Sequence, residues 1–168
     1  MQVCCSPICA IEYAKKSRAK IEKQKSALES RKRRIALESL KTRSDILREA
    51  QQAFNAYIRA RDRIAGHPCI SSGRQLDWSG NNVDAGHYRS TGSAPHLRFD
   101  ERNCHAQSKH DNRYLAGNAV EYRRGLIQRI GINAVEQIES DNTPRKWSKS
   151  DLIAIRDTYK AKLRELKQ

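Results

Sequence analysis

The sequence has few aromatic residues and no long apolar segment. Aromatics make up 6% of its 168 residues and the mean hydropathy is −0.85, which leaves little material for a large core. No apolar run approaches the roughly 20 residues that cross a bilayer, and the first residues lack the apolar stretch of a secretory signal peptide. The sequence therefore predicts a cytoplasmic protein that makes no contact with a membrane.

The cysteine content also excludes a class of protein. Five cysteines, an odd number, without a secretory signal indicate thiols or metal ligands rather than a disulfide framework. Cys5 and Cys9, with Cys4 beside them, supply half of a zinc site, because zinc needs four ligands and no second pair lies nearby. The alternative is an exposed turn with no metal, and the residues leave both open.

Positive charge is the strongest compositional signal. Lys and Arg number 33 against 19 acidic residues, a net charge of +14, and the commonest partner for such a surplus is nucleic acid. The net charge is +9 over residues 1–66, +1 over 67–118 and +4 over 119–168. We therefore expect the near-neutral middle to fold around a site and the basic flanks to hold DNA.

Residues 10–41 predict a long helix, because they are rich in Ala, Lys, Arg and Glu and contain no Gly or Pro. Their larger apolar residues Ile21, Leu28 and Ile35 recur once per seven, which is only half of a coiled-coil seam. A solvated basic helix is one interpretation. In the other, the helix lies along DNA phosphates and contributes Arg31, Lys32, Arg33 and Arg34.

Further elements follow from spacing and from start and stop signals. An amphipathic helix is expected from Ser44 to Gly66 and should pack on the middle of the chain. Residues 83–89 predict a short strand, residues 97–99 its partner strand, and residues 108–115 a helix. Beyond Asn118 the pattern predicts three helices, the last starting at a capping box, Ser148 to Asp151.

Asp84 and His87 have the chemistry needed for phosphodiester hydrolysis. Hydrolysis needs a base for water and a cation for the charge on phosphate. A neutral histidine suits the first task at neutral pH, and carboxylate or amide oxygens suit Mg²⁺. Position 86 shares a strand face with Asp84, so the strand could offer both a ligand and the base His87. Taken alone, His87 is more often a structural histidine.

A resemblance extends this interpretation. The residues from Asp84 to Arg89 and from Glu101 to Asn103 resemble the NinG (Rap) recombination endonucleases of lambda-like phages, which are HNH, or ββα-metal, nucleases. The likeness spans nearly the whole chain. It includes Cys5-Ser6-Pro7, Gln51-Gln52-Ala53, Ala94-Pro95, Leu97-Arg98-Phe99, Gly117-Asn118, Tyr122-Arg123, Ile138-Glu139-Ser140 and Trp147.

The resemblance implies an endonuclease of the host cytoplasm that depends on Mg²⁺ or Mn²⁺ and acts on branched DNA, such as Holliday junctions and D-loops. His87 matches the general base of the family, and Asn103 matches the asparagine that orients it. Asn112 matches a metal ligand. The usual ligand before the histidine is Gly86 here, so we expect Asp84 to take that role.

The chain departs from the family at its structural zinc site. The four cysteine positions that the resemblance implies hold Cys69, Ser72, Ser108 and Asp111. Structural zinc supplies on the order of 10 kcal/mol of folding free energy, which is comparable with the net stability of a domain. We expect no zinc site of the family type. The alternative is a rearranged site completed by a histidine: His67, His105 or His110.

The predicted fold is α+β and mostly helical, with a small ββα-metal (HNH, treble-clef-like) core. We divide the chain into a basic helical extension with a remnant cysteine motif (1–43), a packing helix (44–66), the HNH-like core (67–118) and a C-terminal helical region (119–168). Near the site, the expected phosphate contacts are Arg89, Arg102, Lys109 and Arg113.

Branched DNA is the expected partner, and no small-molecule cofactor is expected. A homodimer would suit the two-fold symmetry of a four-way junction, although no residue demonstrates one. The rival hypothesis is a catalytically impaired protein that binds branched DNA, because three zinc cysteines are replaced. RNA binding is a third, and the scarcity of aromatics for base stacking counts against it.

Overall fold

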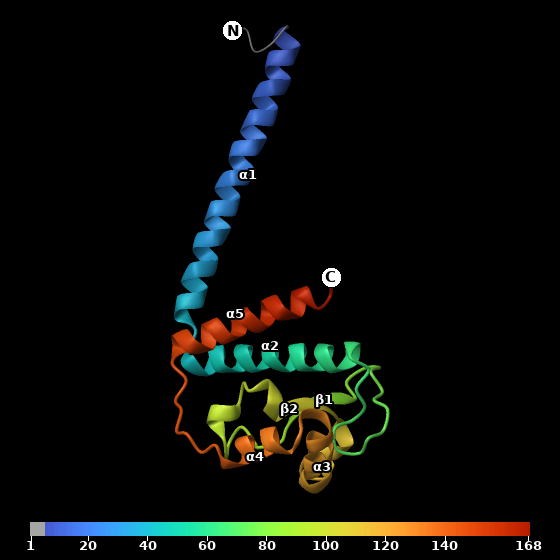
Figure 1. Ribbon diagram of the computed structural model, residues 1–168. Coiled ribbons are helices and arrows are strands. Elements are labelled where there is room, and N and C mark those ends of the chain that lie inside the picture. Colours follow the sequence, from blue (N-terminus) through green and yellow to red (C-terminus); the bar gives the residue numbers. More distant parts are fainter. Residues whose placement is uncertain (1–5) are drawn as a thin grey trace. The chain divides into compact units, whose positions relative to one another are not determined.

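The computed structural model describes residues 6–168 (Figure 1). Cys4 and Cys5 lie outside the described residues, so the expected half zinc site is not described either. The chain divides into two compact units, Met1–Thr42 and Arg43–Gln168. The further division of the second unit into three regions stays a prediction.

The described part of the first unit is one helix, α1 (Pro7–Leu40). It starts where Ser6 accepts a hydrogen bond from the amide of Cys9 at 3.2 Å and where Pro7 occupies the first turn. None of its residues is buried. The expected long helix is thus confirmed, and the heptad residues Ile21, Leu28 and Ile35 are exposed.

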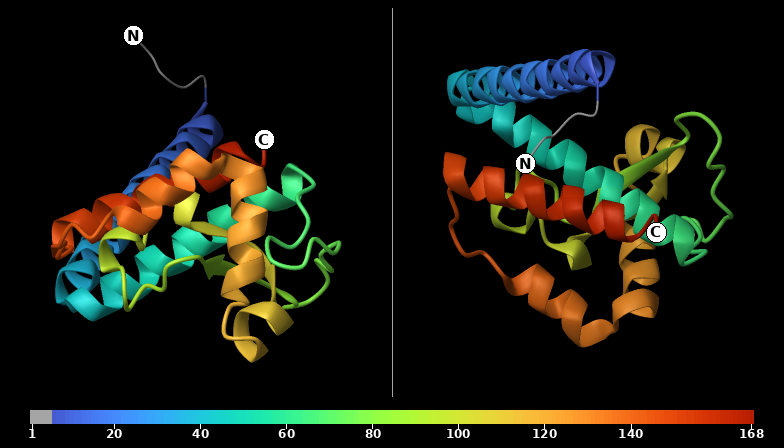
Figure 2. Two further views of the ribbon diagram at one scale, coloured as in Figure 1. Left: turned by 60° about the horizontal axis from the view of Figure 1, so that its bottom comes forward. Right: turned by 90° about the horizontal axis from the view of Figure 1, so that it is seen from above.

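The second unit is built on two helices that pack side by side, α2 (Arg43–Ile64) and α5 (Lys149–Glu165) (Figure 2). The main hydrophobic core lies here and includes Phe54, Phe99, Trp147 and Tyr159. The predicted capping box is confirmed: the Ser148 hydroxyl accepts from the Asp151 amide, and the Asp151 carboxylate accepts from the Ser148 amide.

A two-stranded antiparallel sheet lies against α2 and consists of β1 (Val83–His87) and β2 (Cys104–Ser108). The expected partner strand at 97–99 is wrong. Pro95 fixes φ for a helical turn, so η1 (Pro95–Leu97) is a 3-10 helix, and Phe99 lies in the main core. The true partner strand, β2, contains the polar residues His105 and Gln107, which are buried and donate hydrogen bonds to the carbonyls of Arg102 and Gly117.

Short helices complete the second unit. A second 3-10 helix, η2 (Glu101–Asn103), leads into β2, and one π-helical turn, η3 (His110–Tyr114), follows it within the range expected to be helical. α3 (Ala119–Ile130) ends at Gly131, and α4 (Ile132–Ser140) follows directly. The fold is thus mostly helical with one small sheet. No helix in the described part of the chain is long and apolar enough to span a bilayer.

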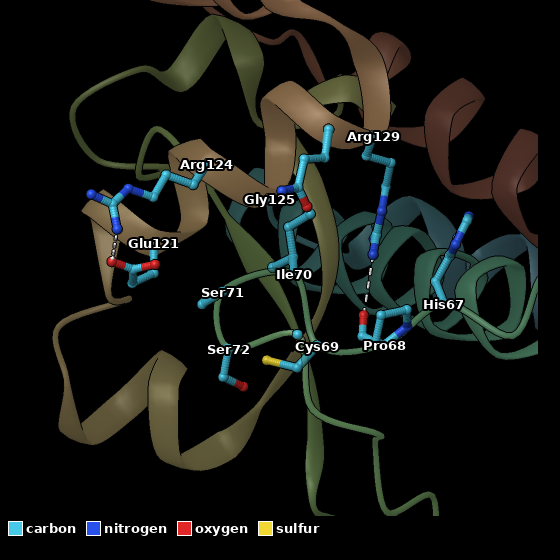
Figure 3. Close-up of a pocket in the computed structure, with 12 residues that line it drawn as sticks. His67, Pro68, Cys69, Ile70, Ser71, Ser72, Glu121, Arg124, Gly125 and Arg129 are labelled. Atoms are coloured by element: carbon cyan, nitrogen blue, oxygen red, sulfur yellow. Dashed lines mark hydrogen bonds and ion pairs between the residues drawn. The ribbon is translucent and has the colours of Figure 1, made fainter.

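The contact between α3 and the turn at 67–73 has no room for a side chain at Gly125 (Figure 3). A Cβ atom there would lie 1.9 Å from the Ile70 carbonyl oxygen. Because Ile70 belongs to a buried cluster with Tyr122, Leu126 and Val135, this contact joins the turn to α3. The close approach of two backbones explains why a helix interior contains glycine here.

Gly125→Ala should therefore lower the free energy of unfolding by about 1–3 kcal/mol through overpacking, although alanine favours an isolated helix by about 1 kcal/mol. Denaturant unfolding measures the sign directly. Gly92→Ala is the matched control, since its Cβ would meet only the Ser90 hydroxyl at 3.9 Å. An unchanged or increased stability of Gly125→Ala would show that the contact is not tight.

Candidate functional site

The structure brings the two expected metal ligands together. Asp84 lies in β1 and Asn112 in η3, and the Asp84 Oδ2 atom accepts a hydrogen bond from Asn112 Nδ2 at 3.0 Å. Arg113 Nε donates to the same oxygen at 2.8 Å. Burial alone would raise the pKa of Asp84, but the hydrogen bonds from Arg113 and Asn112 outweigh it and hold this pKa below its ordinary value.

His87 is held by contacts with other parts of the protein. Its Nε2 atom lies 2.9 Å from the Arg98 carbonyl oxygen, and its Nδ1 atom lies 3.6 Å from the Cys104 sulfur. Because a carbonyl only accepts, Nε2 carries the proton and the lone pair is on Nδ1. Burial lowers the pKa of His87, so the ring is neutral at pH 7.

The expected base and the expected ligands lie on opposite faces of β1. Residues three apart in a strand point to opposite sides. Asp84 faces η3 through Asn112, whereas the ring of His87 packs on Phe54 of α2 with 5.9 Å between centroids. The structure therefore does not place His87 beside the pair of Asp84 and Asn112.

Asn103 acts on the loop that follows His87. Its buried amide donates to the carbonyls of Arg89 at 3.0 Å and Leu97 at 3.2 Å, and its oxygen accepts from the Arg89 amide at 2.8 Å. These three bonds close the loop between β1 and η2. Since the Arg98 carbonyl in that loop accepts the hydrogen bond from His87 Nε2, Asn103 positions His87 indirectly.

The four residues at the implied zinc positions converge, and hydrogen bonds join three of them, whereas the buried Ser72 hydroxyl has no hydrogen-bond partner within residues 6–168. The Cys69 thiol donates to Asp111 Oδ2 at 3.1 Å, the Ser108 amide lies 3.3 Å from the Cys69 sulfur, and the Asp111 amide donates to Ser108 Oγ at 3.1 Å. Ser72 lies beside Cys69 (Figure 3). We call these four residues the thiol–carboxylate cluster.

The thiol–carboxylate cluster does not fit a tetrahedral zinc site of the family type. It contains one thiol and one carboxylate, and no group of three or more His, Cys, Asp or Glu in residues 6–168 could hold a metal ion. Burial alone would raise the pKa of Asp111, but the hydrogen bonds to it, that from Cys69 first, keep the pKa low. The cluster is thus an ionised carboxylate that accepts a hydrogen bond from Cys69 and lies 3.8 Å from the guanidinium of Arg74.

Three of the four expected phosphate contacts near the site are engaged within the protein. Arg89 donates to the carbonyls of Ile138, Glu139 and Asp141 at the end of α4. Arg102 pairs with Asp100, and Arg113 pairs with Asp84. Lys109 takes part in no ion pair within residues 6–168. On α1, Arg31, Lys32, Arg33 and Arg34 are exposed.

The sequence interpretation missed a buried network around Asp62, whose side chain is 1% exposed. Its Oδ2 atom accepts from the Ala106 amide at 2.6 Å, Arg61 Nε lies 2.7 Å from Oδ1, and Arg129 Nη1 lies 3.5 Å from Oδ2. His105 is buried beside them, and burial lowers its pKa to about 3. One signal was present, because Asp62 follows Ile58 by four residues on the apolar face of α2.

These features define a class: a strongly basic, mostly helical α+β protein with one buried hairpin. The family model described as Bacteriophage Lambda NinG protein matches residues 1–168. The chain is 44% identical to Protein ninG of Salmonella phage P22 and 43% identical to that of Escherichia phage lambda, in each case over 97% of this chain and 83% of the relative. It is 47% identical to Protein ninG of Escherichia phage 933W over 77% of this chain and 62% of the relative.

The chain belongs to the NinG family of lambda-like phage proteins. No solved structure matches it.

The thiol–carboxylate cluster predicts stability without zinc. Asp111→Asn should lower the free energy of unfolding by about 1–3 kcal/mol, because buried donors lose a charged acceptor, whereas a chelator should leave the stability of the unchanged protein as it was. Glu136→Gln on the exposed face of α4 is the control and should stay within about 0.5 kcal/mol. Loss of stability on adding chelator would contradict this account, since it would mean that a metal holds the cluster.

Proposed function

We propose that the chain is a metal-dependent DNA endonuclease of the HNH type, which cleaves branched DNA such as Holliday junctions and D-loops. One observation carries the proposal: a strand and the helical turn after its hairpin partner bring Asp84 and Asn112 together. A net charge of +14 supplies the attraction to DNA phosphates.

The pair fits a hard cation that keeps most of its water. Mg²⁺ is typically held by one or two carboxylates together with waters and substrate phosphates. Asp84 offers a carboxylate, and Asn112 offers an amide whose oxygen and nitrogen exchange places by a flip of the side chain. Mg²⁺ or Mn²⁺ bound there would neutralise charge developing on the scissile phosphate. Arg113 supplies positive charge at the same carboxylate.

His87 is the base in this proposal. It is neutral at pH 7, as a base must be, but its lone pair faces the Cys104 thiol and its N–H faces the Arg98 carbonyl. To take a proton from water, the ring must leave one of these contacts. The loop that Asn103 closes carries Arg98, so movement of this loop on DNA binding would free Nε2, which becomes the base once Nδ1 carries the proton instead.

A second function is favoured by the same placement of His87. Its ring lies on the α2 face of β1, away from Asp84, and contacts protein atoms at both nitrogens. A protein that held branched DNA through its basic helices without cleaving it would need no change in this arrangement. The two functions therefore differ in whether the His87 site rearranges when DNA binds or stays unable to cleave it.

Cleavage of a labelled four-way junction with Mg²⁺ or Mn²⁺ distinguishes the two functions. We expect cleavage by the unchanged protein and a loss on the order of 100-fold or more in His87→Ala, the usual contribution of a general base. Asp84→Asn should also lose cleavage, and both variants should keep junction affinity measured with a chelator. His110→Ala, which changes an exposed histidine, is the control. Binding without cleavage by the unchanged protein would favour the inert site.

A further inference from the structure

A pocket of about 460 Å³ lies outside the site described above. It is formed by the second half of α2, the end of α5 and the loop that leads into β1. Its floor includes Val83, the first residue of β1, and Asp84 follows directly. The pocket is therefore next to the candidate site along the chain, on the α2 side of the sheet.

The pocket has an uncompensated positive charge. Arg59, Arg63 and Lys167 line it, and no Asp or Glu does. None of these three cations takes part in an ion pair within residues 6–168. The chemistry of the pocket is thus that of an anion site.

Trp78 gives the pocket a flat aromatic surface. Its side chain is half-buried and belongs to none of the hydrophobic clusters found in residues 6–168. The guanidinium of Arg63 lies 5.8 Å from the centre of the ring, near the outer limit of a cation–π contact. By contrast, Trp147 is buried in the main core and donates a hydrogen bond to the Pro95 carbonyl at 2.9 Å. Packing explains Trp147 and does not explain Trp78.

We propose that this pocket binds an unpaired nucleotide of DNA, with the base against Trp78 and the neighbouring phosphates on Arg59, Arg63 and Lys167. Aromatic side chains beside a basic groove are the usual means of holding single strands, because every base has a face that stacks. A duplex keeps its bases stacked on one another, so an aromatic surface adds nothing to duplex binding. The inference rests on the proposed function, since strands unpair at branch points.

The two tryptophans allow a direct test. Trp147→Phe leaves Trp78 as the only indole, and Trp78→Phe leaves only the buried Trp147. The probe is a thymidine oligonucleotide of about 12 nucleotides, within the usual site size of single-strand binders, added in the presence of a chelator. We expect saturable fluorescence quenching in the unchanged protein and in Trp147→Phe. We expect no quenching in Trp78→Phe. This variant keeps Trp147 in the core, so it tests the site even if Trp147→Phe does not fold.

Affinity provides the second measurement. Arg63→Ala should weaken oligonucleotide binding on the order of tenfold and reduce the slope of log affinity against log salt by about 0.7, the value for one phosphate contact on a single strand. Arg48→Ala is the control on the same helix, because Arg48 already pairs with Asp45 outside the pocket. Both values should be unchanged in this control.

Two results would overturn the inference: oligonucleotide binding with no change in Trp78 fluorescence, or equal quenching by a blunt duplex of the same length. Because the assay contains no divalent cation, it is independent of cleavage. Quenching without cleavage of junctions would contradict the proposed endonuclease activity and support this nucleotide site. Cleavage of junctions without quenching of Trp78 would support the activity and contradict the nucleotide site.

Discussion

The second unit depends on one buried carboxylate. Asp62, near the end of α2, accepts a hydrogen bond from the backbone amide of Ala106 in β2. It also lies beside the guanidinium groups of Arg61 and Arg129. Three elements therefore meet at one charge. Burial alone would raise the pKa of Asp62, but the Arg61 hydrogen bond and charge outweigh it and keep the group ionised. Without its partners such a charge would cost several kcal/mol to bury.

This interaction fixes which side chains of the hairpin face α2 and which face away from it. A shift of one residue in β2 would exchange its faces, and the hydrogen bond from the Ala106 amide to Asp62 opposes such a shift. Pairing then sets β1, where Ala85 lies opposite Ala106 and Asp84 opposite Gln107. The contact between Asp84 and Asn112 and the separation from His87 both follow from that register.

Sequence patterns predicted α1 from its composition, and α2, α3, α4 and α5 from a periodic apolar face or a recognisable cap. They placed β2 wrongly, since its alternating apolar residues, Cys104 and Ala106, are small, and the burial of its polar residues depends on partners from distant parts of the chain. The pair of Asp84 and Asn112 could be expected only through the family resemblance. The direction of the His87 ring could not, because it depends on Phe54, Arg98 and Cys104 together.

The thiol–carboxylate cluster brings together residues that are far apart in the sequence. Cys69 and Asp111 come from segments 42 residues apart and still meet at 3.1 Å. Two backbone hydrogen bonds also hold the segment of Cys69. The Cys69 amide donates to the Arg74 carbonyl, and the Ile70 amide donates to the Ala106 carbonyl. Hydrogen bonds can thus keep the turn at 69–73 on β2 without a metal.

The most direct test of this account is the unfolding free energy of Asp62→Asn. Asparagine can keep the bond to Ala106, but it leaves the charges of Arg61 and Arg129 without their buried partner, so a loss of about 3–5 kcal/mol is expected. Asp157→Asn is the control: the Asp157 side chain is 58% exposed and its partner Arg156 also pairs with Glu49, so stability should change by about 0.5 kcal/mol or less. A loss in Asp62→Asn no larger than in this control would contradict the claim that Asp62 holds the unit together.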